Sequence, residues 1–179
     1  MSKPTRRIVT IDDEDGKSVA VADGPSPDRR TDPARPGYLA ERMWMTNGSP
    51  PSIGAFRDPV LGPHTLEPPR HGTVCRIVTF PPDASFEGKV GGAEVAAFFH
   101  AMGSPGASTY STNAPHPYMQ RTCTLDFCLI LEGEITLVLD TEEVNLKAGD
   151  TVVQRGTNHA WSNRSNRPCV VAISSHDAE

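Results

Sequence analysis

A single histidine stands near the end of the stretch GDTVVQRGTNHAWSN, residues 149–163, among glycines and other turn-forming residues. His159 is followed two residues later by Trp161 and two further on by Asn163. An imidazole can serve as a general acid or base because its pKa lies near physiological pH, and its neutral nitrogen can also bind a metal. In an extended strand Trp161 shares the face of His159, so its indole is a candidate wall for a planar ligand or a core residue. A lone histidine can equally be polar filling, so its meaning depends on the elements that position it.

Length, charge and cysteine content limit the class of protein. The chain has 179 residues, which suits one domain with an additional arm, and its formal charge of −5 provides no basic face for nucleic acid. We therefore expect a small-molecule partner. No apolar run approaches the roughly 18 residues that span a bilayer, and the start of the chain lacks an apolar signal segment, so we predict no membrane partner and a cytoplasmic location. The cysteines are scattered without a CxxC pair, which favours reduced thiols over zinc or disulfides.

The first 70 residues differ in composition from the rest. They contain eleven of the seventeen prolines, a density that excludes long helices and central strands. Short strands are expected at 6–12, 17–23 and 37–46, the first two joined as a hairpin. We predict that residues 1–70 form an arm that lies against a barrel of residues 71–179 or against a partner subunit. Because such an arm buries little apolar surface alone, we also predict a homodimer.

The remainder of the chain is typical of an all-β protein with one short helix. Residues 71–82 read as a strand, and residues 91–103 as a helix with an apolar stripe that ends at Gly103. Short strands separated by turns then follow at 118–124, 126–134, 135–140, 142–150, 151–156, 159–163 and 168–174. No further helix is expected, and this spacing of strands favours an antiparallel sandwich or barrel.

Two segments of this half carry a family resemblance. DFCLILEGEITLVLD, residues 126–140, has a glycine at the turn, and LKAGDTVVQRGTNHAWSN, residues 146–163, contains His159. Together they resemble the two motifs of the cupin superfamily. The resemblance implies a double-stranded β-helix (jelly-roll) barrel, here with a Pro-rich N-terminal arm and one short helix.

The same resemblance assigns site positions. The first cupin motif normally carries two histidines and a glutamate, and in this sequence Gln120, Thr122 and Asp126 stand at those positions. His159 is the one family ligand that remains. Strand alternation would place Gln120, Thr122 and Asp126 on one face, directed into the barrel with His159.

Three functions are compatible with this set. The favoured one is a lyase or isomerase of dehydratase-like type without a cofactor. In it His159 is the general base or acid, Asp126 orients the imidazole and raises its pKa, Gln120 and Thr122 bind an oxygen of the substrate, and Trp161 forms a wall. The first alternative is an oxygenase that holds a divalent transition metal on His159, Asp126 and Gln120. The second is a non-catalytic cupin that binds a metabolite in the same pocket.

Other polar residues near the motifs have lesser expected roles. Arg121 and Arg155 could hold a carboxylate, although the alternation directs Arg121 outward. His116 could replace a missing metal ligand, but its position between two prolines favours a loop residue. Asn163 is expected to close a turn. The sequence does not identify the substrate.

Overall fold

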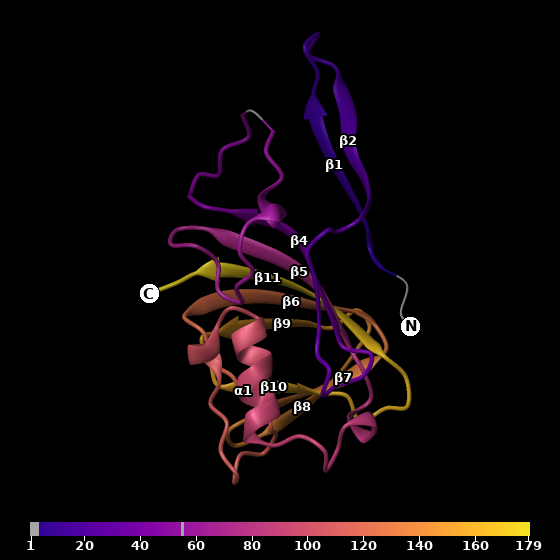
Figure 1. The fold of residues 1–179 in the computed structure, drawn as a ribbon, viewed down its shortest axis with the longest axis vertical. Coiled ribbons are helices and arrows are strands. Elements are labelled where there is room, and N and C mark those ends of the chain that lie inside the picture. Colours follow the sequence, from indigo (N-terminus) through magenta and orange to yellow (C-terminus); the bar gives the residue numbers. More distant parts are fainter. Residues whose placement is uncertain (1–3, 55) are drawn as a thin grey trace.

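The computed structural model describes residues 4–54 and 56–179 and shows two antiparallel sheets packed together with one α-helix at their side (Figure 1). The strands are β1 (Arg6–Asp12), β2 (Ser18–Pro25), β3 (Arg29–Thr31), β4 (Leu39–Thr46), β5 (Thr73–Phe80), β6 (Thr124–Glu132), β7 (Glu134–Leu139), β8 (Glu143–Lys147), β9 (Thr151–Arg155), β10 (His159–Ser162) and β11 (Cys169–Asp177). The helices are α1 (Gly92–Ala101) and three 3₁₀ turns, η1 (Pro59–Leu61), η2 (Asp83–Ser85) and η3 (Pro105–Ala107). Within the described chain, no helix has the length and apolar character needed to cross a bilayer.

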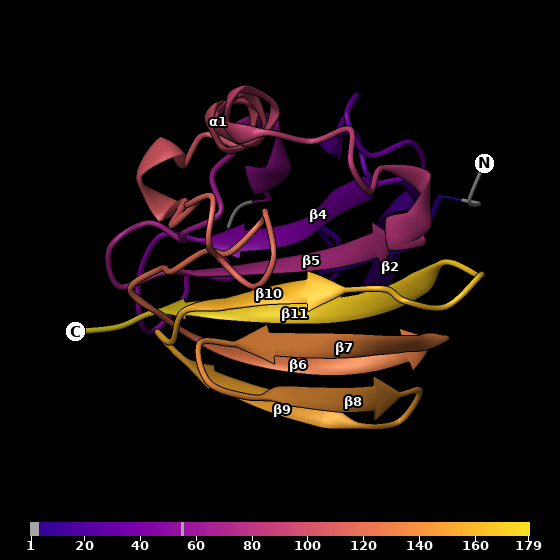
Figure 2. The same ribbon diagram turned by 90° about the horizontal axis from the view of Figure 1, so that it is seen from below.

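The larger sheet has the strand order β3-β4-β5-β11-β6-β9, and the smaller has the order β10-β7-β8. Figure 2 shows the small sheet stacked on the β11-β6-β9 part of the large one, with α1 on the side of β4, away from β8 and β9. The predicted all-β barrel with one helix is therefore confirmed. The strands that complete it come from before the helix, as expected.

The N-terminal region contributes to the barrel as well as to an arm. The predicted hairpin is present as β1 and β2, and it stands out from the barrel in Figure 1. β3 and β4, by contrast, extend the large sheet, with β4 hydrogen-bonded along β5. Residue 70 therefore falls between two neighbouring strands of one sheet.

The helix closes the part of the barrel that the small sheet leaves uncovered. α1 begins with the backbone N–H of Gly91 donating to the Glu94 carboxylate at 2.9 Å, and it buries Val95, Phe98 and Phe99. Its end is fixed at Gly103, which has a φ of +69° and lies so close to His64 that an added Cβ would sit 1.9 Å from the His64 carbonyl oxygen. Only glycine suits this position, as the sequence predicted.

One predicted strand is wrong. Residues 118–123 do not form a strand, and β6 begins only at Thr124. In this segment Gln120 alone forms isolated bridges, with Ser108 and His159. The backbone of the segment is satisfied elsewhere, since Arg121 N–H donates to the Ala107 carbonyl at 2.8 Å. The alternation of side chains between 120 and 126 therefore does not come from a continuous strand.

The aromatic core joins both sheets to the helix. Tyr38, Phe80, Phe98, Tyr118 and Trp161 belong to one buried cluster and contact one another edge-on or tilted. Aromatic pairs of this kind add about 0.5–1.5 kcal/mol each to the free energy gained by burial. The core therefore holds α1 against the inner face of the barrel, where the site lies.

Candidate functional site

A small internal cavity of about 60 Å³ lies between the inner face of the large sheet, β10 and α1. Gln120, Thr122, Asp126, His159 and Trp161, the five residues predicted from the sequence, all line it. This volume is the space open to the centre of a water molecule, and one water needs about 10–15 Å³ of it. The cavity therefore has room for a few waters or for the polar end of a ligand. The residues predicted from the sequence therefore line one cavity. Strand alternation does not explain the positions of Gln120 and Thr122, because β6 begins only at Thr124.

His159 is held at the beginning of β10 in a defined orientation. The side chain is only 4% exposed. Its Nδ1 lies 2.9 Å from the Thr157 carbonyl oxygen, and its Nε2 lies 3.3 Å from the Gln120 side-chain nitrogen. Because a carbonyl can only accept, Nδ1 carries the proton, and Nε2 accepts from the Gln120 amide with its lone pair.

The surroundings of His159 favour the neutral imidazole. Burial is the largest influence on His159 and lowers its pKa below the ordinary value, while the hydrogen bond to Thr157 and, more weakly, the charge of Asp126 oppose this. Nε2, whose lone pair accepts from the Gln120 amide, is the basic atom of the ring. His159 can therefore accept a proton at neutral pH.

Asp126 does not orient His159, contrary to the sequence prediction. Within the described chain no hydrogen bond joins the two side chains, and the carbonyl oxygen of Thr157 fixes the imidazole instead. The net pKa of His159 is lowered rather than raised, since burial outweighs the distant carboxylate. Asp126 lies on β6 between Gln154 of β9 and Ser175 of β11. Its Oδ1 is buried without a hydrogen-bond partner among the described residues.

Thr122 and Trp161 line the cavity mainly through packing and local bonds. The Thr122 hydroxyl lies 2.7 Å from the Thr124 hydroxyl, so one of its hydrogen-bonding positions is already used. The Trp161 ring stands nearly perpendicular to the His159 ring, at 83° with centroids 6.2 Å apart, and it also contacts Phe80. Trp161 is thus both a core residue and a wall of the cavity.

Arg76 on β5 is a buried cation that the sequence analysis missed. It is 5% exposed and donates to the carbonyl oxygens of Thr65 and Leu66 at 3.2 and 2.6 Å, and to the Ser175 hydroxyl at 3.0 Å. Burial lowers its pKa, and the largest opposing influence is the negative charge of Asp126. Arg76 and Asp126 therefore lie in one cavity as opposite charges, without an ion pair between them among the described residues.

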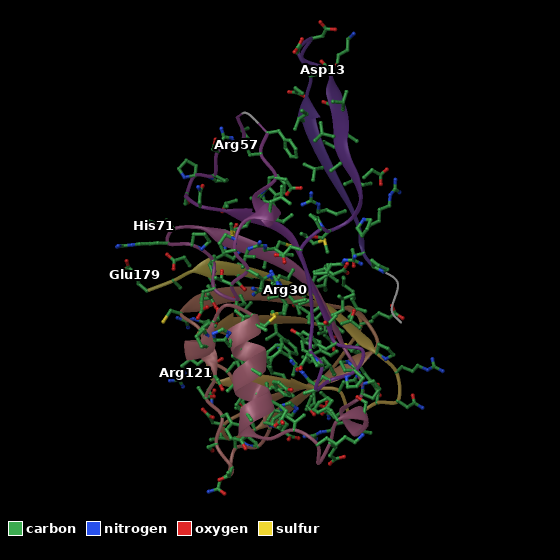
Figure 3. The ribbon with its side chains drawn as sticks, viewed as in Figure 1. Asp13, Arg30, Arg57, His71, Arg121 and Glu179 are labelled. Atoms are coloured by element: carbon green, nitrogen blue, oxygen red, sulfur yellow. The ribbon has the colours of Figure 1, made fainter. Side chains whose placement is uncertain are left out.

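A second missed cation, Arg35, lies in the loop between β3 and β4. It is 4% exposed, pairs with Asp32 at 2.7 Å and lines the cavity. The arginines singled out from the sequence lie elsewhere: Arg121 and Arg155 are exposed, and Figure 3 shows Arg121 at the outer edge of the molecule. The guanidinium groups of the site thus come from strands and loops before the helix.

His116 and Asn163 have structural positions. His116 is a buried loop residue whose Nδ1 accepts from the Tyr118 backbone N–H at 3.1 Å, and it is not among the residues lining the cavity. Asn163 closes a turn, as predicted, because its side chain donates to the carbonyl oxygens of Phe80 and Arg167. Neither side chain supplies a replacement for a missing cupin ligand.

The thiols are free, as predicted. All four cysteines, Cys75, Cys123, Cys128 and Cys169, are unpaired. Cys128 lines the cavity, but burial raises the pKa of its thiol to about 12. It therefore remains protonated at neutral pH and is a poor nucleophile.

The donor set does not fit the transition metal of a typical cupin. One imidazole and one carboxylate line the cavity, and among the described residues no three His, Cys, Asp or Glu side chains gather at one point. Gln120 directs its amide nitrogen, a donor, at His159 Nε2. The predicted metal set of His159, Asp126 and Gln120 therefore lacks the chemistry of a divalent site.

The two packed antiparallel sheets with a cavity between them form a cupin-type double-stranded β-helix. Residues 105–175 match the family described as "Cupin domain". This segment of the chain is therefore similar to a cupin domain, as the motifs indicated.

The chain is similar to proteins of fungal biosynthesis clusters. It is 57% identical over 49 residues to phomopsin biosynthesis cluster protein C′ of Diaporthe leptostromiformis, an alignment that covers 27% of this chain and 26% of that protein. It is 27% identical over 161 residues to the cupin-domain-containing oxidoreductase fogC of Aspergillus ruber, covering 88% of this chain and 63% of the relative. The chain thus matches only about a quarter of the first relative's length.

Among solved structures, the chain is similar to the cupin domain of Schizosaccharomyces pombe Cnp3. It is 9% identical, covers 98% of this chain and 89% of its own, and gives a TM-score of 0.45. A likeness this weak carries no argument about function.

Proposed function

We propose that this protein is a small-molecule enzyme of lyase or isomerase type, in which His159 moves a proton inside the cupin barrel. The observation that carries the proposal is the neutral imidazole with its Nε2 lone pair on the cavity side. The carbonyl of Thr157 fixes the Nδ1–H tautomer, and Gln120 holds the ring at the other nitrogen. A substrate that enters the cavity displaces the Gln120 amide from Nε2 and presents a C–H or O–H bond there.

The proton balance of such a step is simple. Nε2 takes the proton, and the imidazolium that forms is stabilised by the Thr157 carbonyl and the charge of Asp126. The proton then returns to another atom of the substrate, which is an isomerisation, or leaves with a departing group, which is an elimination. Nδ1 stays protonated throughout. No cofactor is required for either outcome.

Hydrogen–deuterium exchange tests this proposal before the physiological substrate is known. A panel of small hydroxy and keto acids is incubated with the protein in D₂O, and loss of carbon-bound protons is followed by proton NMR. We expect exchange that requires His159 and disappears in His159→Gln. The exposed His100→Gln variant is a matched control that keeps the exchange. A panel that shows no exchange above buffer, or equal exchange in His159→Gln, would overturn the proposal.

A second candidate function is oxidation or reduction of a small molecule. It is favoured by the name of the Aspergillus ruber relative, an oxidoreductase that aligns with most of this chain. The same reaction mixtures distinguish the two, because a redox reaction changes the oxidation state of the substrate and needs a partner that gains or loses electrons. A non-catalytic binding cupin, in turn, would hold ligands without either outcome.

A further inference from the structure

Arg35 has an unusually enclosed guanidinium. Its Nε donates to Asp32 Oδ2 at 2.7 Å, and its Cζ lies 3.5, 4.2 and 4.3 Å from the ring centroids of Tyr118, Tyr38 and Phe98. The Tyr118 hydroxyl donates to the same Asp32 oxygen at 2.9 Å, which ties the aromatic ring to the ion pair. The aromatic faces and the carboxylate together hold the guanidinium plane in one position.

One nitrogen of this group is both fully buried and without a hydrogen-bond partner among the described residues. Arg35 Nη2 is buried and forms no hydrogen bond within the described part of the chain, although the residue lines the cavity. Leaving a buried charged donor unpaired is costly, and natural proteins nearly always satisfy such groups. A ligand atom that accepts a hydrogen bond in the cavity would satisfy Nη2.

The same cavity contains an unpaired acceptor. Asp126 is 7% exposed, and its Oδ1 is buried without a hydrogen-bond partner. A ligand that satisfies both atoms carries an acceptor for Arg35 and a donor for Asp126. A carboxylate is the natural acceptor, because its bond to a guanidinium is charge-assisted, and a hydroxyl is a compact donor.

Charge and size exclude a larger anion. The two positive charges of Arg35 and Arg76 are opposed by the negative charges of Asp32 and Asp126. The cavity therefore tolerates a monoanion better than a dianion. Its volume of about 60 Å³ suits a group of a few atoms. A phosphate ester is therefore a poor fit.

We propose that the cavity binds a small hydroxy carboxylic acid, with the ligand's carboxylate on Arg35 Nη2 and its hydroxyl donating to Asp126 Oδ1. The inference rests on the proposed function, since it names the substrate class of the same site. It places the carbon skeleton of the ligand in the cavity that His159 lines. Arg35 is a binding residue in this scheme, and His159 alone transfers the proton.

Titration of the full-length wild-type protein with glycolate, glycolamide and inorganic phosphate, followed by NMR, tests the ligand class. Glycolamide has nearly the shape of glycolate but no charge. We expect glycolate to bind about 10–100-fold more tightly than glycolamide, which corresponds to the loss of one charge-assisted hydrogen bond. Phosphate is expected to bind more weakly than glycolate. Equal affinity for glycolate and glycolamide, or tighter binding of phosphate, would overturn the inference without any variant being made.

Variants then assign the contact. Arg35→Gln is expected to remove the preference for glycolate over glycolamide, whereas the exposed Arg155→Gln keeps it. Circular dichroism checks that each variant is folded, and if Arg35→Gln does not fold, the wild-type ligand comparison decides. A folded Arg35→Gln that still prefers glycolate would contradict the assignment.

His159→Gln separates this inference from the proposed function. It should still bind glycolate but should catalyse no deuterium exchange. Glycolate binding that depends on Arg35, combined with no exchange in any acid, supports the ligand site and refutes proton transfer. Exchange that persists in Arg35→Gln, or in substrates without a carboxylate, supports proton transfer and refutes the carboxylate site.

Discussion

Asp126 is expected to be coupled energetically to Arg76 rather than to His159, and a double-mutant cycle measures this. Arg76→Met keeps most of the side-chain volume but removes a buried charge. It leaves the carbonyl oxygens of Thr65 and Leu66 without the bonds of 3.2 and 2.6 Å that the guanidinium provides. Each unsatisfied acceptor costs about 1–3 kcal/mol. Since both hydrogen bonds are only partly buried, we expect Arg76→Met to lower the free energy of unfolding by about 3 kcal/mol, near the lower end for two acceptors.

The cycle is completed by Asp126→Asn alone and by the double variant. Asp126→Asn should lower the free energy of unfolding by about 1–3 kcal/mol, because it removes the negative charge that favours the buried Arg76 guanidinium. In the double variant the cost of Arg76→Met should fall by about 1–3 kcal/mol, since no carboxylate remains to be compensated. Urea unfolding followed by tryptophan fluorescence measures all four proteins. A matched cycle of Asp126→Asn with His159→Gln should give a smaller coupling.

Two outcomes would refute this account of the cavity charges. Losses that add within about 0.5 kcal/mol in the Arg76 cycle would show that the two charges are independent. A larger coupling in the His159 cycle would show that Asp126 and His159 form the pair that the sequence predicted.

Three further predictions concern the imidazole, its environment and the helix. Gln120→Glu places a carboxylate about where the amide now lies, 3.3 Å from His159 Nε2, so the pKa of His159 should rise by about 1–3 units and deuterium exchange at pH 7 should fall. The control Gln120→Met should leave the imidazole neutral. An unchanged NMR titration of His159 in Gln120→Glu would contradict this. Burial lowers the pKa of both His64 and His159 in the folded protein, so below the unfolded value near 6.5 the unfolded state binds more protons. The free energy of unfolding should therefore fall as the pH falls, by up to about 1.4 kcal/mol per pH unit for each histidine. Urea unfolding between pH 8 and 5 should show a shallower loss in His159→Gln, and an identical slope would argue against the neutral imidazole. Gly103→Ala should destabilise the protein by at least about 2 kcal/mol, because the added Cβ would lie 1.9 Å from the His64 carbonyl oxygen. Gly106→Ala is the control, because Gly106 has open space around it and the added Cβ should cost little. Thermal unfolding of the two variants measures the difference.

The barrel was predictable because its signals are local. Glycines at turns, short strands and the helix stop at Gly103 each leave a mark in a few consecutive residues. His159 was located by the cupin motif, and its inward position follows from the strand it begins. Residues 118–123 were misread because alternation resembles a strand even where the backbone bonds to a loop.

The charges of the site were less predictable. Arg76 shares the buried face of β5 with Val74, Val78 and Phe80, so a charged residue among apolar ones was a readable signal. Arg35 lies in a Pro-rich loop, where no periodicity shows which side chains turn inward. The partner of Asp126 depends on strands far apart in the sequence, and spacing within one motif cannot supply it. The homodimer and the cytoplasmic location stay predictions.

The most direct test of the central claim is the protonation state of His159 in the wild-type protein at pH 7. Long-range proton–nitrogen NMR correlations of the ¹⁵N-labelled protein distinguish the two neutral tautomers and the imidazolium, and His159→Gln assigns the signal. The account predicts a neutral ring with the proton on Nδ1 and none on Nε2, and a pKa below 6.5. A ring protonated on both nitrogens at pH 7, or a neutral ring with the proton on Nε2, would contradict it.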